Sequence, residues 1–60
     1  MKSKAEILKQ FVEKQVDKFV DGQPAIDTMM LIADFVTALN QAKNEIEIKK
    51  VIEWGNEQNE

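Results

Sequence analysis

The chain has 60 residues and contains no cysteine, no histidine and no tyrosine, and all eight of its basic residues are lysine. Without cysteine it can form neither a disulfide nor a thiolate metal site, and these commonly stabilise small secreted domains. The lack of histidine removes the usual general base and a frequent metal ligand. These absences argue against nucleophilic catalysis and against a metal cofactor, and they favour a cytoplasmic location.

Long apolar runs are also absent, since the longest uncharged stretch is the segment 35–42. A transmembrane helix needs about 20 predominantly apolar residues. The lysines at positions 2 and 4 would suit the start of a signal peptide, but Glu6 and Lys9 interrupt the apolar region that must follow. We therefore expect neither a membrane span nor a signal peptide.

Positive charge is scarce, and the formal net charge is −3. Nucleic-acid binding draws much of its affinity from basic groups that release counterions. A helix-turn-helix arrangement is also disfavoured, because the second predicted helix carries Asp27 and Asp34 and has no basic residue before Lys43. DNA is therefore not an expected partner.

The first helix is predicted over residues 4–21. Ser3 followed by Glu6 is typical of a capping box at a helix start. Gly22 suits the residue after a helix end, and Pro24 suits the first turn of the next helix. At 100° per residue the apolar side chains form one continuous arc, which comprises Ile7, Leu8, Phe11, Val12, Val16, Phe19 and Val20.

The second helix is predicted over residues 24–42, and its apolar arc is much wider, at about 220° on the helical wheel. Only a narrow polar strip remains, marked by Asp27, Asp34 and Gln41 at heptad spacing. A helix that is apolar over more than half its circumference needs neighbours on two sides. It is therefore expected to be the central helix or to lie in an interface. The arc comprises Ile26, Met29, Leu31, Ile32, Ala33, Phe35, Val36 and Leu39.

A third helix is predicted over residues 45–54, with Asn44 as its N-cap and a polar, frayed tail over 55–60. If residues 24–54 formed one unbroken helix, Ile48, Val51 and Ile52 would lie on the side opposite the apolar arc of residues 24–42. A break near Lys43 is therefore expected. The alternation of apolar and charged residues over 45–49 also fits a strand, which would have to pair with a second copy of the chain.

The fold expected from these patterns is all-α: a small three-helix bundle, a single domain over 1–54, which associates with itself. A chain of this size gains little net stability from its own core, so further burial would matter. A dimer is the favoured state, and the contact candidates are Met30, Leu31, Phe35, Gln15 and Trp54.

Each of these candidates also has an ordinary structural explanation. Met30, Leu31 and Phe35 are expected to form an exposed apolar ridge suited to adaptable contacts, although apolar residues at helical spacing usually fill a core. Gln15 lies within the first apolar arc, where one polar residue can fix the register of a coiled-coil seam or simply bond to a neighbouring carbonyl. Trp54 either covers the bundle or anchors an interface.

The sequence therefore predicts a non-enzymatic protein-interaction module that acts as an adaptor, a regulator or an inhibitor, without a cofactor. Short chains rich in lysine, isoleucine and glutamate are common products of mobile elements, so a phage-type inhibitor is one form that this function could take. One alternative is a homo-oligomer that binds a small anionic ligand, such as a nucleotide, between subunits at lysines and helix N-termini. A second alternative is a helical dimer that binds RNA through lysines.

Overall fold

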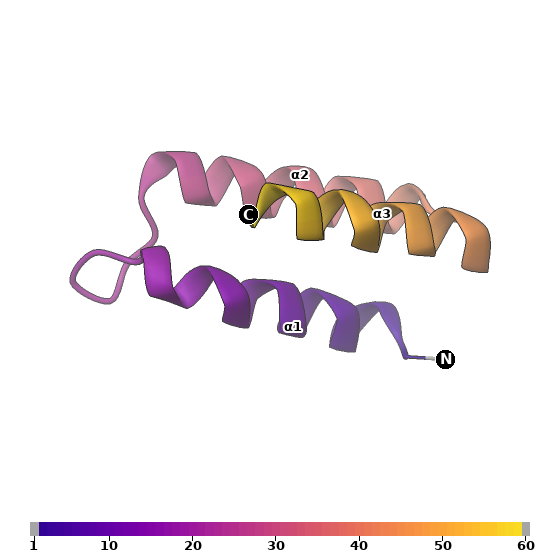
Figure 1. Ribbon diagram of the computed structural model, residues 1–60, viewed down its shortest axis with the longest axis horizontal. Coiled ribbons are helices and arrows are strands. Elements are labelled where there is room, and N and C mark those ends of the chain that lie inside the picture. Colours follow the sequence, from indigo (N-terminus) through magenta and orange to yellow (C-terminus); the bar gives the residue numbers. More distant parts are fainter. Residues whose placement is uncertain (1, 60) are drawn as a thin grey trace.

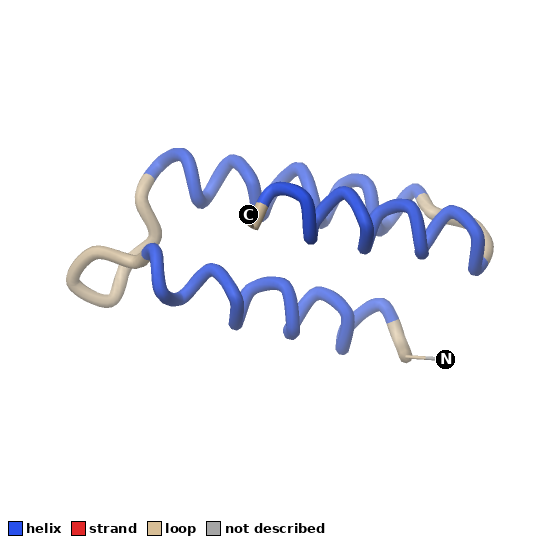
Figure 2. The backbone as a smooth tube through the Cα atoms, viewed as in Figure 1, coloured by secondary structure: helices blue, strands red, loops and turns tan. Residues whose placement is uncertain are grey.

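A computed structural model describes residues 2–59 and contains the three predicted α-helices (Figure 1). They are α1 (Lys4–Gln15), α2 (Ile26–Gln41) and α3 (Glu45–Gln58), and a single 3-10 turn, η1 (Val16–Lys18), follows α1. Residues 2–59 include no strand (Figure 2). The predicted all-α three-helix bundle is confirmed.

Helix α2 is the centre of the bundle, as its wide apolar arc predicted. Both α1 and α3 pack against it, and each runs antiparallel to it (Figure 1). The molecule is elongated, with extents of 36 × 19 × 17 Å. Helix α3 starts beside the C-terminal end of α2 and stops before it reaches the loop that precedes α2 (Figure 1). The first turns of α2 are therefore not covered by α3.

The core forms where the three helices meet. The rings of Phe11 on α1 and Phe35 on α2 are parallel, with centroids 3.9 Å apart. Gly55 of α3 lies against both rings, and a Cβ atom at this position would be 2.7 Å from Cε1 of Phe35. A glycine is therefore what allows α3 to approach the aromatic pair. The buried apolar residues are Ile7, Phe11, Phe35, Leu39, Ala42 and Ile48.

Two of the helix starts are capped as the sequence predicted. Oγ of Ser3 accepts a hydrogen bond from the backbone N–H of Glu6 at 3.2 Å, and Oδ1 of Asn44 accepts one from the N–H of Glu47 at 3.0 Å. Each bond satisfies an N–H group that has no partner within its own helix. Since residues 45–49 lie in α3, the strand alternative for this segment is wrong.

The first helix is shorter than predicted. Helix α1 ends at Gln15, and the chain leaves helical conformation after η1. Asp21 and Gly22 have φ angles of 53° and 78°, and Val20 and Gln23 exchange two backbone hydrogen bonds, at 2.7 and 3.0 Å. Two central residues with positive φ are typical of a type I′ turn, for which Asp-Gly is a favoured sequence. This turn replaces the last predicted helical residues.

The other boundaries also differ from the prediction. Helix α2 begins at Ile26 rather than Pro24, with Ala25 at the N-cap. Helix α3 continues to Gln58, so the frayed tail expected from residue 55 is wrong for 55–58, while residue 60 lies outside the described residues. The physical reason is that Gly55 is buried against the core and does not end the helix.

Candidate interaction surface

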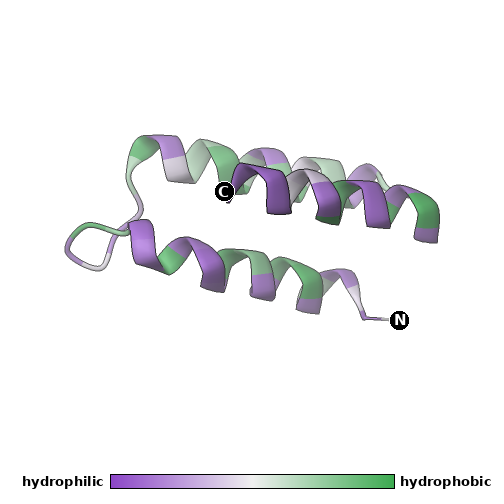
Figure 3. Ribbon diagram, viewed as in Figure 1, coloured by the Kyte–Doolittle hydropathy of each residue, from purple (hydrophilic) through white to green (hydrophobic). Residues whose placement is uncertain are grey.

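The most exposed large apolar side chains of the second helix lie on its first turns. Ile26, Met29 and Met30 keep 70, 49 and 61% of their surface exposed. Together with the exposed Ala33 they follow the spacing i, i+3, i+4, i+7, which places them on one face of α2. We call this set, Ile26, Met29, Met30 and Ala33, the outer face of α2. Its hydrophobic start lies beyond the end of α3 (Figure 3).

Two valines add apolar surface to the same end of the molecule. Val16 lies in η1 and Val20 in the turn before α2, and both are more than half exposed. The predicted apolar arc placed both side chains in the core. Val16 keeps αR conformation at the C-cap of α1 and lies about 140° from the buried Phe11 on the helical wheel, at the edge of the arc. Val20 lies beyond η1, where the step of 100° per residue no longer applies.

The charges of α2 are few and lie on one flank of the outer face. Asp27 and Asp34 are the only charged residues of the helix, and both are exposed. With Ile26 and Ala33 at d positions of a heptad and Met30 at an a position, both aspartates occupy e positions. The opposite flank, at the g positions, carries Met29 and Val36. The outer face is therefore apolar, with acidic groups on one side only.

The predicted ridge of Met30, Leu31 and Phe35 is not present as a continuous exposed surface. Phe35 is 2% exposed and belongs to the core, so its assignment to an exposed ridge is wrong. Leu31 is half-buried and packs against the core, and only Met30 faces solvent. The face of α2 that turns toward the bundle includes the buried Thr28, which places Met29 and Ile26 outward.

Gln15 is fully buried, and its contacts lie within the chain. Its Nε2 donates a hydrogen bond to the backbone carbonyl of Phe11 at 3.5 Å and a second one to Oδ1 of Asn59 on the C-cap of α3. Oε1 of Gln15 and Nδ2 of Asn59 are buried and have no partner in the described part of the chain. Gln15 thus connects the end of α1 to the end of α3, and it is not accessible to a second copy in this conformation.

Trp54 is partly buried and covers the core. Its ring lies 6.4 Å from that of Phe35, at an interplanar angle of 19°. The sequence left two roles open for Trp54, covering the bundle or anchoring an interface. The contact with Phe35 fits the first role. Ile26 is not among the contact residues predicted from the sequence. Its place at the edge of the wide apolar arc of the second helix nevertheless indicates that it can be exposed.

No helix in the described part of the chain combines the length and the apolar character required to cross a bilayer. Within residues 2–59, no group of three or more acidic side chains is placed to hold a metal ion. Comparison with models of protein families, with curated proteins and with solved structures finds no match to this chain.

Proposed function

We propose that this chain is a non-enzymatic protein-interaction module, and that it binds a helical segment of a partner protein with the outer face of α2. Such a module would act as an adaptor, a regulator or an inhibitor of that partner. The observation that carries the proposal is the exposure of Ile26, Met29 and Met30 on one uncovered helix face. Contiguous apolar patches of this kind mark interaction sites more often than single exposed apolar residues do.

The total exposed surface supports this proposal. The chain exposes 4547 Å², which is roughly 550 Å² more than the scaling of surface with mass gives for a compact monomer of 6.9 kDa. The outer face contributes to this exposed area, because it lies on the side of α2 opposite the buried Thr28 and Phe35. An added helix from another protein would pack against this side of α2.

The energy available from the outer face suits a reversible contact. Burying the exposed parts of Ile26, Met29 and Met30 would contribute about 3–5 kcal/mol, and a partner would contribute a similar amount from its own side chains. Association itself costs at least about 4 kcal/mol in lost translational and rotational freedom. A favourable net free energy of binding therefore requires a partner whose matching face is also apolar. Val16 and Val20 can extend the contact.

The flanking charges favour a partner with basic residues over a second copy of this chain. In an antiparallel pair of α2 helices, e positions face e positions, so the Asp27 and Asp34 carboxylates of both copies would repel each other. In a parallel pair they would face the uncharged Met29 and Val36. A partner helix with lysine or arginine beside its apolar stripe would instead meet opposite charges, which determine partner choice more than affinity.

The test uses two synthetic amphipathic helices that share leucine at every a and d position. One carries lysine at all e and g positions, and the other carries glutamate there. We expect the lysine peptide to bind at least about tenfold more tightly, as measured by fluorescence anisotropy. Ile26→Asp should weaken its binding, whereas Ile46→Asp should not, although Ile46 on α3 is equally exposed, at 68%.

Equal effects of Ile26→Asp and Ile46→Asp would contradict the proposal, because binding would then not depend on the outer face of α2. Light scattering of the free chain provides the other decisive result. If the chain forms a dimer that Ile26→Asp dissociates and Ile46→Asp does not, the occupant of the outer face is a second copy, and the proposal of a basic partner helix is wrong.

A further inference from the structure

A cleft lies between α1 and α3, on a different part of the molecule from the outer face of α2. It consists of two adjoining cavities, of about 130 and 380 Å³, which share Lys2, Ile7 and Ile52 in their walls. The larger cavity extends to Glu45, at the start of α3, and the smaller one reaches Asn56. Along α3 these two residues are separated by roughly 16 Å, at 1.5 Å per residue.

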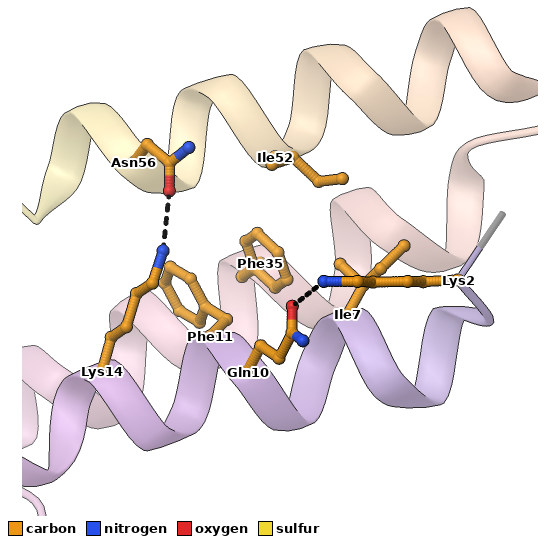
Figure 4. A pocket seen from close by; sticks show the side chains of 8 residues that line it. All are labelled: Lys2, Ile7, Gln10, Phe11, Lys14, Phe35, Ile52 and Asn56. Carbon is orange, nitrogen blue, oxygen red and sulfur yellow. Dashed lines mark hydrogen bonds between the residues drawn. The ribbon is translucent and has the colours of Figure 1, made fainter.

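The floor of the cleft is apolar and comes from all three helices. Figure 4 shows the smaller cavity, with Ile7 and Phe11 on α1, Ile52 on α3 and Phe35 of α2 behind them. Ile48 continues the apolar wall in the larger cavity. The larger cavity alone lies within the size range of sites that bind small molecules, about 300–1,000 Å³.

The rim of the cleft carries a positive net charge, from Lys2, Lys14 and Lys49 against the single carboxylate of Glu45, in contrast to the net charge of −3 for the whole chain. Nζ of Lys2 donates a hydrogen bond to Oε1 of Gln10 at 2.9 Å, and Nζ of Lys14 donates one to Oδ1 of Asn56 at 3.1 Å (Figure 4). Both acceptors are neutral amides. Each ammonium group has three donors, so both lysines retain N–H groups and charge for an anion at the rim.

We propose that this cleft binds a free carboxylate with a linear apolar chain. The carboxylate accepts hydrogen bonds from Lys2 and Lys14, and the chain lies along Ile7, Ile48 and Ile52. A chain of ten carbons has nine C–C bonds and extends roughly 11 Å, at about 1.2 Å per bond, and therefore fits within the length of the cleft. The ligand is held inside one copy of the chain, so the site needs no second subunit.

The isoleucines of the cleft provide a direct readout. Decanoate, titrated below its micelle concentration, is expected to shift the NMR signals of the Ile7, Ile48 and Ile52 methyl groups and to leave those of Met29 and Met30 in place. Decanol, which has the same apolar chain without the charge, should bind at least about fivefold more weakly. Shifts confined to Met29 and Met30 would overturn the proposal, because they would show adsorption to the outer face of α2.

Matched lysine variants test the role of the rim. The double variant Lys2→Gln with Lys14→Gln should lower the affinity for decanoate by about tenfold and leave the affinity for decanol unchanged. Lys9→Gln is the control, because Lys9 is exposed on α1 and lines neither cavity. If the double variant and the control bind decanoate equally well, the assignment of the carboxylate to Lys2 and Lys14 is wrong.

This inference is independent of the proposed protein contact. Ile26→Asp, which should weaken binding to the basic peptide, is expected to leave decanoate binding unchanged. A parallel loss of both activities in Ile26→Asp would contradict the separation of the two sites, provided that circular dichroism shows an unchanged fold.

Discussion

The rings of Phe11 and Phe35 are stacked in parallel, 3.9 Å apart, and Gly55 of α3 lies against the edges of both. This contact joins three segments that are far apart in the sequence. An aromatic pair contributes about 0.5–1.5 kcal/mol beyond the area that it buries. In a chain of this length, whose total stability is expected to be about 3–9 kcal/mol, one such contact is a large part of the whole.

Replacing Phe35 is therefore expected to destabilise the protein severely. Phe35→Ala should cost about 3–5 kcal/mol through lost burial and the cavity that remains, which approaches the total stability. Met30→Ala is the control, because Met30 is exposed and its truncation should change stability by less than about 0.5 kcal/mol. Urea denaturation followed by circular dichroism measures both. Similar midpoints for the two variants would contradict the placement of Phe35 in the core.

Gly55 gives a prediction that opposes ordinary helix propensity. In an exposed helix interior, glycine to alanine gains about 0.5–1 kcal/mol. In Gly55→Ala the new methyl group would meet Phe35 at 2.7 Å and Phe11 at 3.0 Å, so we expect a net loss of about 1–3 kcal/mol from overpacking. Thermal unfolding monitored by circular dichroism checks this, and a stabilised variant would show that α3 does not approach the aromatic pair this closely.

Gly22 provides the comparison for a different mechanism. A Cβ atom there would meet nothing within 4 Å, but the residue has a φ of 78°. Gly22→Ala should therefore lose about 1 kcal/mol to backbone strain alone. The loss should be independent of Phe11, whereas the loss in Gly55→Ala should shrink when Phe11 is replaced by leucine. Identical behaviour of the two glycine variants in the Phe11→Leu background would contradict this distinction.

The sequence was sufficient to predict the elements that depend on local chemistry. Ser3 and Asn44 cap the helices as expected, and the change of apolar phase correctly placed a break near Lys43. What it missed depends on contacts between distant residues. Gly55 resembles a helix stop until its place against Phe35 is known. The Asp21-Gly22 pair indicated a turn, but the apolar spacing of Val16, Phe19 and Val20 indicated a helix that continues to residue 21.

The candidate surface shows the same limit. The width of the apolar arc on the second helix correctly indicated two neighbours, α1 and α3. Which part of the arc stays exposed depends on the sides of α2 against which α1 and α3 pack, and this is a tertiary property. The sequence therefore identified Met30 as exposed but assigned Phe35 to the same surface, although Phe35 faces the core.

The pair formed by Gln15 and Asn59 is expected to couple the ends of α1 and α3. Each of Gln15→Ala and Asn59→Ala removes one partner of a hydrogen bond that lies largely inside the protein. A double-mutant cycle from urea denaturation should give a coupling free energy of about 0.5–1.5 kcal/mol. A coupling free energy near zero would show that the two amides do not interact in solution.

The outer face of α2, where Ile26, Met29 and Met30 are exposed, is the proposed partner-binding surface. The most direct measurement is an NMR titration with the lysine-flanked helical peptide, in which the methyl groups of Met29, Met30 and Ile46 are observed together. We predict saturable shifts at Met29 and Met30 and an unchanged Ile46. Shifts of equal size at Ile46, or no saturable shift at either methionine, would contradict the claim.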